Sequence, residues 1–297
     1  MKLIRGIALL ICFLIIGKAF AQVRDSIPLI VADSLKAVYI YADTGKAPNR
    51  TDAQGRKQGL WEKRYPNGKL RYRGHFVNDK PNAVFKYFWD NDSMQNIAVY
   101  SDNGKVAYSK MFYENGGVFS MGKFITEKRD SIWLFYDEGL KLIKKEQYVV
   151  GKKEGKSVVF GADGNVIEMK TWHNDVENGP WLQYFPDGQV KLKTAYLNGK
   201  REGEVTLYSD GDESVPSIQG FYRNDCKDGK WIYLDSRSGE HDTIVYKNDK
   251  PVDDAKYRLT KRRIDSLKMK YQDSQQRLDH PGNDMENYNG GGGDDGR

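Results

Sequence analysis

Two stretches of the chain decide the fold: GLWEKRYPNGKLRYRGHFVND at residues 59–79 and GPWLQYFPDGQVKLKTAYLNG at residues 179–199. They align from end to end without a gap, so that Trp61 matches Trp181 and Gly68 matches Gly188. In each stretch a Pro-Asn-Gly or Pro-Asp-Gly turn separates two runs, the second of which alternates apolar and polar residues. Asn-Gly and Asp-Gly between alternating runs are the strongest short signal for a β-hairpin. Each stretch is therefore predicted to be one hairpin.

The same frame recurs through residues 55–250, which we interpret as about eight tandem copies. One column, in steps of 23 to 26 residues, comprises Trp61, Val84, Ser109, Trp133, Ser157, Trp181, Val205 and Trp231. A turn column comprises Gly68, Gly116, Gly139, Gly164, Gly188, Gly211 and Gly239. A second aromatic column comprises Phe76, Phe124, Trp172 and Tyr196. The tryptophans and the residues of the last column, with Gly68, Gly116, Gly139, Gly164 and Gly188, are the predicted structural positions of the repeat.

These columns predict an all-β protein, an elongated single-layer antiparallel sheet of tandem hairpins. Stacked copies place equivalent residues side by side, and cross-strand aromatic pairs contribute roughly 0.2–1 kcal/mol each. The tryptophans are therefore expected to form a hydrophobic row. The intervening Lys, Arg, Glu and Gln residues predict a solvated opposite face.

The spacing Gly-x-Trp-x-x-x-Tyr/Phe-Pro-Asn/Asp-Gly-x-Leu/Val, with a period near 24 residues, resembles the MORN repeat variant. That family includes the YwqK-type proteins, which are labelled antitoxin-like. The resemblance covers about residues 55 to 250. It implies a sheet of hairpins that binds or scaffolds other molecules and does not catalyse a reaction.

The ends of the chain carry different patterns. Residues 1–21 have a charged start, an apolar stretch and an Ala-Phe-Ala site, which predict a secretory signal peptide. Its removal takes away three positive charges and lowers the formal net charge from +6 to +3. Residues 22–54 are predicted to cap the first sheet edge, residues 251–280 to form a helix that caps the last hairpin or recruits a partner, and residues 281–297 to be disordered.

No catalytic, cofactor or metal site is predicted. GKKEGKS at residues 151–157 has three residues between its glycines where a phosphate loop needs four, and the repeat frame explains it as a junction. The four histidines form no close pair, and Cys226 is the only cysteine after residue 21. A formal charge of +3 does not argue for a nucleic-acid partner.

We therefore expect an exported, non-enzymatic repeat scaffold that mediates protein–protein interaction in the envelope of a Gram-negative bacterium, in the periplasm or at the outer membrane. Two alternatives stay open. One is a module that binds a glycan or a lipid surface through the aromatic rows. The other is an antitoxin or immunity-type protein. The sequence does not name the partner.

Overall fold

The computed structural model describes residues 47–209, 212–234, 239–261 and 265. The chain divides into two compact units. Unit 1 extends to Leu142 and includes Tyr148–Lys152, whereas unit 2 comprises Ile143–Gln147 and the residues from Lys153 onward. The predicted signal peptide, the predicted tail and most of the predicted N-terminal cap lie outside the described residues, as does Gly211 of the turn column.

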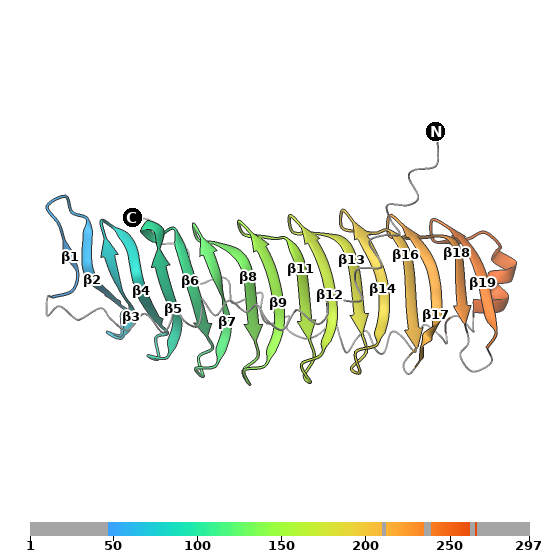
Figure 1. Cartoon of the computed structure of the whole chain (residues 1–297), viewed down its shortest axis with the longest axis horizontal. Helices are drawn as coiled ribbons and strands as arrows, with labels where there is room; N and C mark the ends of the chain where they lie inside the picture. The colour runs from blue at the N-terminus through green and yellow to red at the C-terminus, as the bar shows by residue number, and fades with distance from the viewer. Residues whose placement is uncertain (1–46, 210–211, 235–238, 262–264, 266–297) are drawn as a thin grey trace. The chain divides into compact units, whose positions relative to one another are not determined.

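Unit 1 is an antiparallel meander in which each strand from β2 to β8 pairs with the next one along the chain (Figure 1). A short 3-10 turn, η2 (Asp102–Gly104), joins two of its strands. Its strands are β1 (Arg50–Thr51), β2 (Lys57–Arg64), β3 (Leu70–Val77), β4 (Lys80–Phe88), β5 (Met94–Ser101), β6 (Val106–Phe112), β7 (Val118–Ile125) and β8 (Lys128–Tyr136). Two further strands, β9 (Leu142–Val149) and β10 (Lys152–Lys153), contribute residues to both units.

Unit 2 is built in the same way, with antiparallel pairs from β9–β11 through to β19–β20. Its strands are β11 (Gly155–Phe160), β12 (Val166–His173), β13 (Val176–Tyr184), β14 (Val190–Leu197), β15 (Lys200–Arg201), β16 (Gly203–Ser209), β17 (Asp212–Arg223), β18 (Cys226–Leu234), β19 (His241–Lys247) and β20 (Lys250–Pro251). The predicted all-β fold of tandem antiparallel hairpins is confirmed.

The turn inside hairpin β2–β3 is a three-residue loop, and the same hydrogen bonds recur in the hairpins as far as β13–β14. The Gly68 N–H donates to the Tyr65 carbonyl over 2.9 Å, and the Tyr65 N–H donates to the Lys69 carbonyl over 2.8 Å. Gly68 is left-handed, with φ of 84°, whereas Asn67 is not. The Asn67 Oδ1 atom instead accepts a 3.0 Å hydrogen bond from the Lys69 N–H. Glycine is thus required for its backbone, and the preceding Asn or Asp for its side chain.

The turns between hairpins are of a different kind. Asn78 and Asp79 both have positive φ, at 51° and 66°, which is the pattern of a two-residue type I′ turn. The Asp79 carboxylate accepts a 2.7 Å hydrogen bond from the Lys57 N–H, and the Asp79 N–H donates to the Lys57 carbonyl over 3.2 Å. The same double link to the preceding junction is made by Asp175, Asp225 and Asp249. These junction turns therefore bind neighbouring copies together.

Two members of the predicted columns are wrong by one residue. Phe85, and not Val84, lies in line with Trp61, because Gly74 pairs with both Trp61 and Phe85. The left-handed residue in the hairpin turn after β8 is Leu140, with φ of 65°, and not Gly139. With both corrections the copies repeat every 24 residues from Trp61 as far as Val205.

The core of each unit lies on one face, which we name the tryptophan face. In unit 1 its central positions are Trp61, Phe85, Ser109 and Trp133, and in unit 2 they are Ser157, Trp181, Val205 and Trp231. Trp133 has an exposed fraction of 0% and Trp231 of 2%. Gly122 and Gly220 leave room for these two indoles, since a Cβ there would lie 2.3 Å and 2.2 Å from the ring atoms. Trp133 and Trp231 are therefore packed against the backbone itself.

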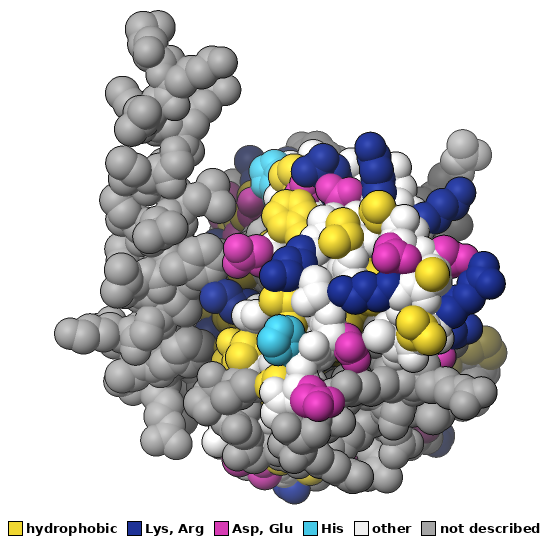
Figure 2. Space-filling model, turned by 90° about the vertical axis from the view of Figure 1, so that its right-hand side faces the viewer, with side chains coloured by type: hydrophobic (Ala, Val, Ile, Leu, Met, Phe, Trp, Pro, Cys, Tyr) yellow, Lys and Arg dark blue, Asp and Glu magenta, His cyan; other side chains and the backbone are white. Residues whose placement is uncertain are grey.

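Strand β2 of unit 1 and the core of unit 2 at β19 are each contacted by additional chain. The Asn49 N–H donates to the Leu60 carbonyl, and the Asn49 side chain accepts from the Glu62 N–H, so residues before β2 occupy its outer edge. At the other end, residues 254–261 and 265 are helical, and Tyr257 packs on the core of unit 2 with its ring 6.3 Å from that of Tyr246. Figure 2 shows this end, where cationic and anionic side chains are interspersed with apolar ones. Covered, charged ends of this kind oppose edge-to-edge pairing.

Candidate interaction surfaces

The predicted aromatic residues lie on the tryptophan face of their own unit. Unit 1 brings Trp61 and Phe76 together, with ring centroids 6.0 Å apart, and likewise Phe124 and Trp133 at 4.7 Å. Unit 2 brings together Trp181 and Tyr196, at 5.6 Å, and also contains Trp172 and Trp231. The predicted glycines Gly68, Gly116, Gly164 and Gly188 are left-handed turn residues.

The second aromatic row is longer than the sequence comparison indicated. Its additional members are Tyr100, Tyr148, Tyr222 and Tyr246. Tyr222 and Tyr246 lie opposite the left-handed Gly203 and Gly229 in the neighbouring strand. A strict 24-residue step from Phe76 finds Tyr100 and Tyr148, so the signal was present in the spacing.

Two members of the tryptophan row, Trp133 and Trp231, are structural and do not form a binding platform. The Trp133 Nε1–H donates to the Lys123 carbonyl over 3.1 Å, and the Trp231 Nε1–H donates to the Phe221 carbonyl over 3.2 Å. Buried indoles with a satisfied N–H and no exposed ring have nothing left to offer a ligand. The stacking reading of the tryptophan row therefore has no support at Trp133 or Trp231.

One part of the tryptophan face is polar instead of aromatic. In unit 2 the Glu146 carboxylate is held between two ammonium groups, at 3.0 Å from Lys144 Nζ and 3.1 Å from Lys153 Nζ. Lys153 also places its Nζ 4.7 Å from the centroid of the Trp172 ring. Glu146 is buried, so its charge is balanced inside the unit.

A second charged group lies on the adjacent strands β12 and β13. Lys170 Nζ is 2.9 Å from Glu177 and 3.8 Å from Glu168, and 5.0 Å from the Trp181 ring centroid. Burial lowers the pKa of Lys170, but the two carboxylates outweigh burial, so that its pKa is raised. Gln183 donates a 3.3 Å hydrogen bond to Glu168. We name the following residues the polar cluster: Lys144, Glu146, Lys153, Glu168, Lys170, Glu177 and Gln183.

Four buried atoms in and beside the polar cluster have no hydrogen-bond partner in the described part of the chain. They are Trp172 Nε1, Trp181 Nε1, Gln183 Oε1 and Thr194 Oγ1. Thr194 pairs with Trp181, and Gln183 lies two residues farther along the same strand, so both side chains share the tryptophan face. Buried polar atoms are almost always paired in folded proteins, so this concentration is unusual.

The opposite face of unit 1 carries a mixed surface that the sequence analysis did not identify. Two adjacent rows of half-buried side chains cross β4, β5, β6 and β7. We name them the basic-apolar patch, which consists of Val84, Val99, Tyr108 and Lys123 in one row and Lys86, Ile97, Lys110 and Met121 in the other. It contains three lysines and no carboxylate.

The prediction of a purely charged and solvated opposite face is therefore wrong. Leu134 in unit 1 and Leu182 in unit 2 both lie on this face and are buried. The alternation of residues misleads here because the equivalent residues at positions 134, 158 and 182 are apolar, whereas those at positions 62, 86 and 110 are charged. The residue type on the opposite face therefore changes from charged to apolar between copies.

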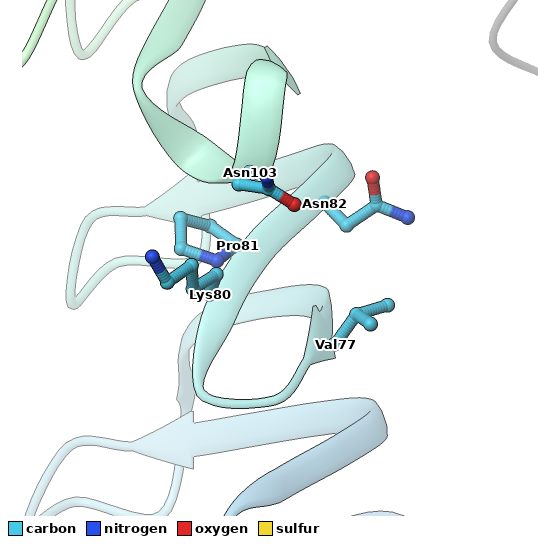
Figure 3. Close-up of a pocket in the computed structure, with 5 residues that line it drawn as sticks. All are labelled: Val77, Lys80, Pro81, Asn82 and Asn103. Carbon is cyan, nitrogen blue, oxygen red and sulfur yellow. The ribbon is translucent and has the colours of Figure 1, made fainter.

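A small open pocket beside the junction of β3 and β4 is lined by Val77, Lys80, Pro81, Asn82 and Asn103. Figure 3 shows that the Val77 and Lys80 side chains point to different sides, so these groups do not converge. In the part of the chain that the structure describes, no three or more His, Cys, Asp or Glu side chains gather as a metal site. No helix among the described residues is long and apolar enough to cross a membrane.

Comparison with known families identifies the repeat. The MORN repeat variant family matches residues 57–78 and 177–198. These two segments are MORN repeat variants. Each covers one hairpin, β2–β3 or β13–β14, and the other hairpins repeat the same frame outside the matched residues. MORN repeats generally mediate interactions with proteins or with membrane lipids.

The other comparisons add no functional argument. A search of curated proteins finds no match to the chain. One solved structure, described as the S. aureus TarM G117R mutant in complex with Fondaparinux, alpha-GlcNAc-glycerol and UDP, is 15% identical with a TM-score of 0.26. The match covers 42% of this chain and 22% of that one. A score this low indicates neither a shared fold nor a shared activity.

Proposed function

We propose that this protein is an exported, non-enzymatic MORN-repeat scaffold of the bacterial cell envelope that binds an acidic protein partner through the basic-apolar patch. The observation that carries the proposal is the composition of that patch. Lys86, Lys110 and Lys123 stand among apolar side chains with no carboxylate between them. Export rests on the leader-like pattern of residues 1–21.

The patch has the composition of an interface centre. Tyr and Met are enriched at protein interfaces, and Tyr108 and Met121 lie here beside Val84, Val99 and Ile97. The strands beneath are held on their other side by the packed tryptophan face, so the surface is rigid before a partner arrives. Preorganisation of this kind lowers the entropy that binding costs. The lysines favour a partner of opposite charge and raise its rate of association.

The proposal is tested by affinity purification of the full chain from the envelope fraction of its source cells. Lys86→Glu combined with Lys110→Glu is expected to abolish retention of an acidic protein that the unsubstituted chain retains at physiological salt. The matched control is Lys80→Glu, which reverses an exposed charge at the junction turn after β3. Equal retention by all three proteins would contradict the proposed surface. Binding to anionic lipid vesicles, with no protein retained, would favour a membrane surface instead.

A further inference from the structure

The polar cluster of unit 2 places Lys170 in a central row whose described members in unit 1 are aromatic or small residues. In unit 1 the central row of the tryptophan face pairs Phe85 with Ala98 and Ser109 with Gly122. The equivalent row of unit 2 pairs Ser157 with Lys170, and Lys170 in turn with Trp181. The Lys170 side chain is only 25% exposed, and its charge is paired with carboxylates, as is usual for a lysine withdrawn from water. In the copies around β11 to β13, charged and hydrogen-bonding side chains therefore occupy positions that hold apolar or small side chains in unit 1.

The charges of the cluster cancel. Lys144, Lys153 and Lys170 face Glu146, Glu168 and Glu177, and each ammonium group lies within 4.0 Å of a carboxylate. Lys144 and Lys153 share Glu146, and Lys170 contacts both Glu168 and Glu177, so three positive charges balance three negative ones. A site without net charge offers no net attraction to a phosphate, a carboxylate or a metal cation. The ligand that it suits is neutral and polar.

The unpaired atoms point to such a ligand. Gln183 is 4% exposed and Thr194 is 5% exposed, and the Gln183 Oε1 and Thr194 Oγ1 atoms lack partners among the described residues. An unpaired buried polar atom is destabilising, whereas an apolar replacement of the same shape is neutral or stabilising. Together the two atoms can accept hydrogen bonds from hydroxyl groups, and the threonine can also donate one.

Two aromatic rings border the same cluster. Trp172 and Trp181 are half-buried, and each has an N–H without a described partner. A lysine ammonium lies over each ring, and the Lys153 and Lys170 side chains are 29% and 25% exposed. These are flexible side chains that reach solvent, so a ligand can displace them from the ring faces. Indole rings beside hydrogen-bonding groups suit a molecule with an apolar face and a polar rim.

We propose that the polar cluster, bordered by Trp172 and Trp181, binds a neutral oligosaccharide. The apolar face of a pyranose ring stacks on the indoles, and its hydroxyl groups pair with Gln183 Oε1, Thr194 Oγ1 and the indole N–H groups. The site lies on the tryptophan face of unit 2, whereas the proposed protein surface lies on the opposite face of unit 1. The two proposals therefore rest on different residues and can be tested independently.

The test uses Thr194→Val in the full chain, with chitohexaose and cellohexaose as probes. The substitution keeps the shape and removes the unpaired hydroxyl, so it is expected to raise the melting temperature of the free protein. It is also expected to weaken saccharide binding at least about tenfold, because the ligand then loses a buried hydrogen bond. Tryptophan fluorescence is expected to change on binding, since the probes stack on two of the indoles.

The matched control is Ser120→Ala in unit 1. Ser120 is 0% exposed, lies on the tryptophan face, and also has a hydroxyl without a described partner. This variant should gain stability without changing the affinity for either saccharide. Gln183→Met supplies a second variant of the site, with the same expected loss of binding.

The proposal is overturned if neither saccharide shifts the melting temperature or the fluorescence at about 10 mM, a concentration well above a millimolar dissociation constant. It is also overturned if Thr194→Val and Gln183→Met bind as tightly as the unsubstituted chain. Binding of anionic vesicles that Thr194→Val abolishes would assign the site to a lipid surface and would reject the saccharide. The retention of a protein partner in the patch experiment is expected to be unchanged in all of these variants.

Discussion

Gly122→Ala is predicted to destabilise unit 1 because of what the added methyl group would meet. A Cβ at residue 122 would lie 2.3 Å from Cδ2 and 2.4 Å from Cε2 of Trp133. Carbon atoms in contact normally stand about 3.5–4.0 Å apart, so either the indole or the strand must move by more than about 1 Å. Trp133 has little freedom to move, because Phe124 packs against it and the Arg129 guanidinium lies 4.8 Å from its ring centroid.

The expected cost is about 2 kcal/mol. Overpacking of a filled core costs about 1–3 kcal/mol, and alanine recovers roughly 0.5–1 kcal/mol relative to glycine in a strand. The same exchange should be harmless where the indole is gone. Trp133→Ser alone is expected to cost about 3–5 kcal/mol, and Gly122→Ala added to it should cost nothing or stabilise slightly. An Ala–Ser pair already exists on this face, at Ala98 and Ser109.

The assay is urea unfolding of the four proteins of this double-mutant cycle, followed by circular dichroism. The predicted coupling free energy between the two sites is about 2–3 kcal/mol. Gly139→Ala is the control, because its Cβ would approach no closer than 3.3 Å to any atom and its φ is not left-handed. The packing argument is refuted if Gly122→Ala costs the same in both backgrounds, or costs no more than Gly139→Ala.

Three further predictions concern the turns. Leu140→Gly should raise the free energy of unfolding by about 1–2 kcal/mol, because Leu140 has φ of 65°, and Gly164→Leu should lower it by a similar amount in urea melts. Val150→Asn should also stabilise, by about 1 kcal/mol in the same assay, since Val150 is a β-branched residue with φ of 49° in a type I′ junction; no gain would mean that this turn is not strained. The pKa of Glu154 is lowered from 4.5 by its hydrogen bond with His173. The contribution of Glu154 to stability is thus present above pH 4.5 and is lost as the pH falls below that value. Glu154→Gln should therefore make the melting temperature less dependent on pH in that range. An unchanged dependence would contradict the role given to the Glu154–His173 hydrogen bond.

The fold could be predicted because the residues within each copy specify a hairpin, and successive copies specify the same hairpin. Pro66-Asn67-Gly68 specifies a hairpin whatever its surroundings, and the alternation after it specifies a face. The corrections arise where a copy lacks those signals. Ala83 has a left-handed φ of 58° where several other copies, such as Gly59 and Gly155, have glycine, and Leu140 follows Gly139 in a turn without the usual Asn-Gly pair. In both places the hydrogen-bonding register, and not residue type, determines the alignment.

The surfaces could not be predicted because they depend on register across strands. Lys86, Ile97 and Lys110 lie on three successive strands and become neighbours only when β4, β5 and β6 are paired. The polar cluster has the same origin, since Glu168 and Gln183 meet across β12 and β13. Neither the basic-apolar patch nor the polar cluster can therefore be recognised from the residues of a single copy.

The central claim is that the tryptophan face is structural in unit 1 and that the partner meets the opposite face. Site-specific photo-crosslinking in the source cells tests it most directly, with benzoylphenylalanine placed at Tyr108 or at Tyr100. Tyr108 in β6 belongs to the basic-apolar patch, whereas Tyr100 in the adjacent strand β5 belongs to the tryptophan face. We predict a crosslink to an acidic protein from Tyr108 and none from Tyr100. A crosslink from Tyr100 with none from Tyr108 would contradict the account.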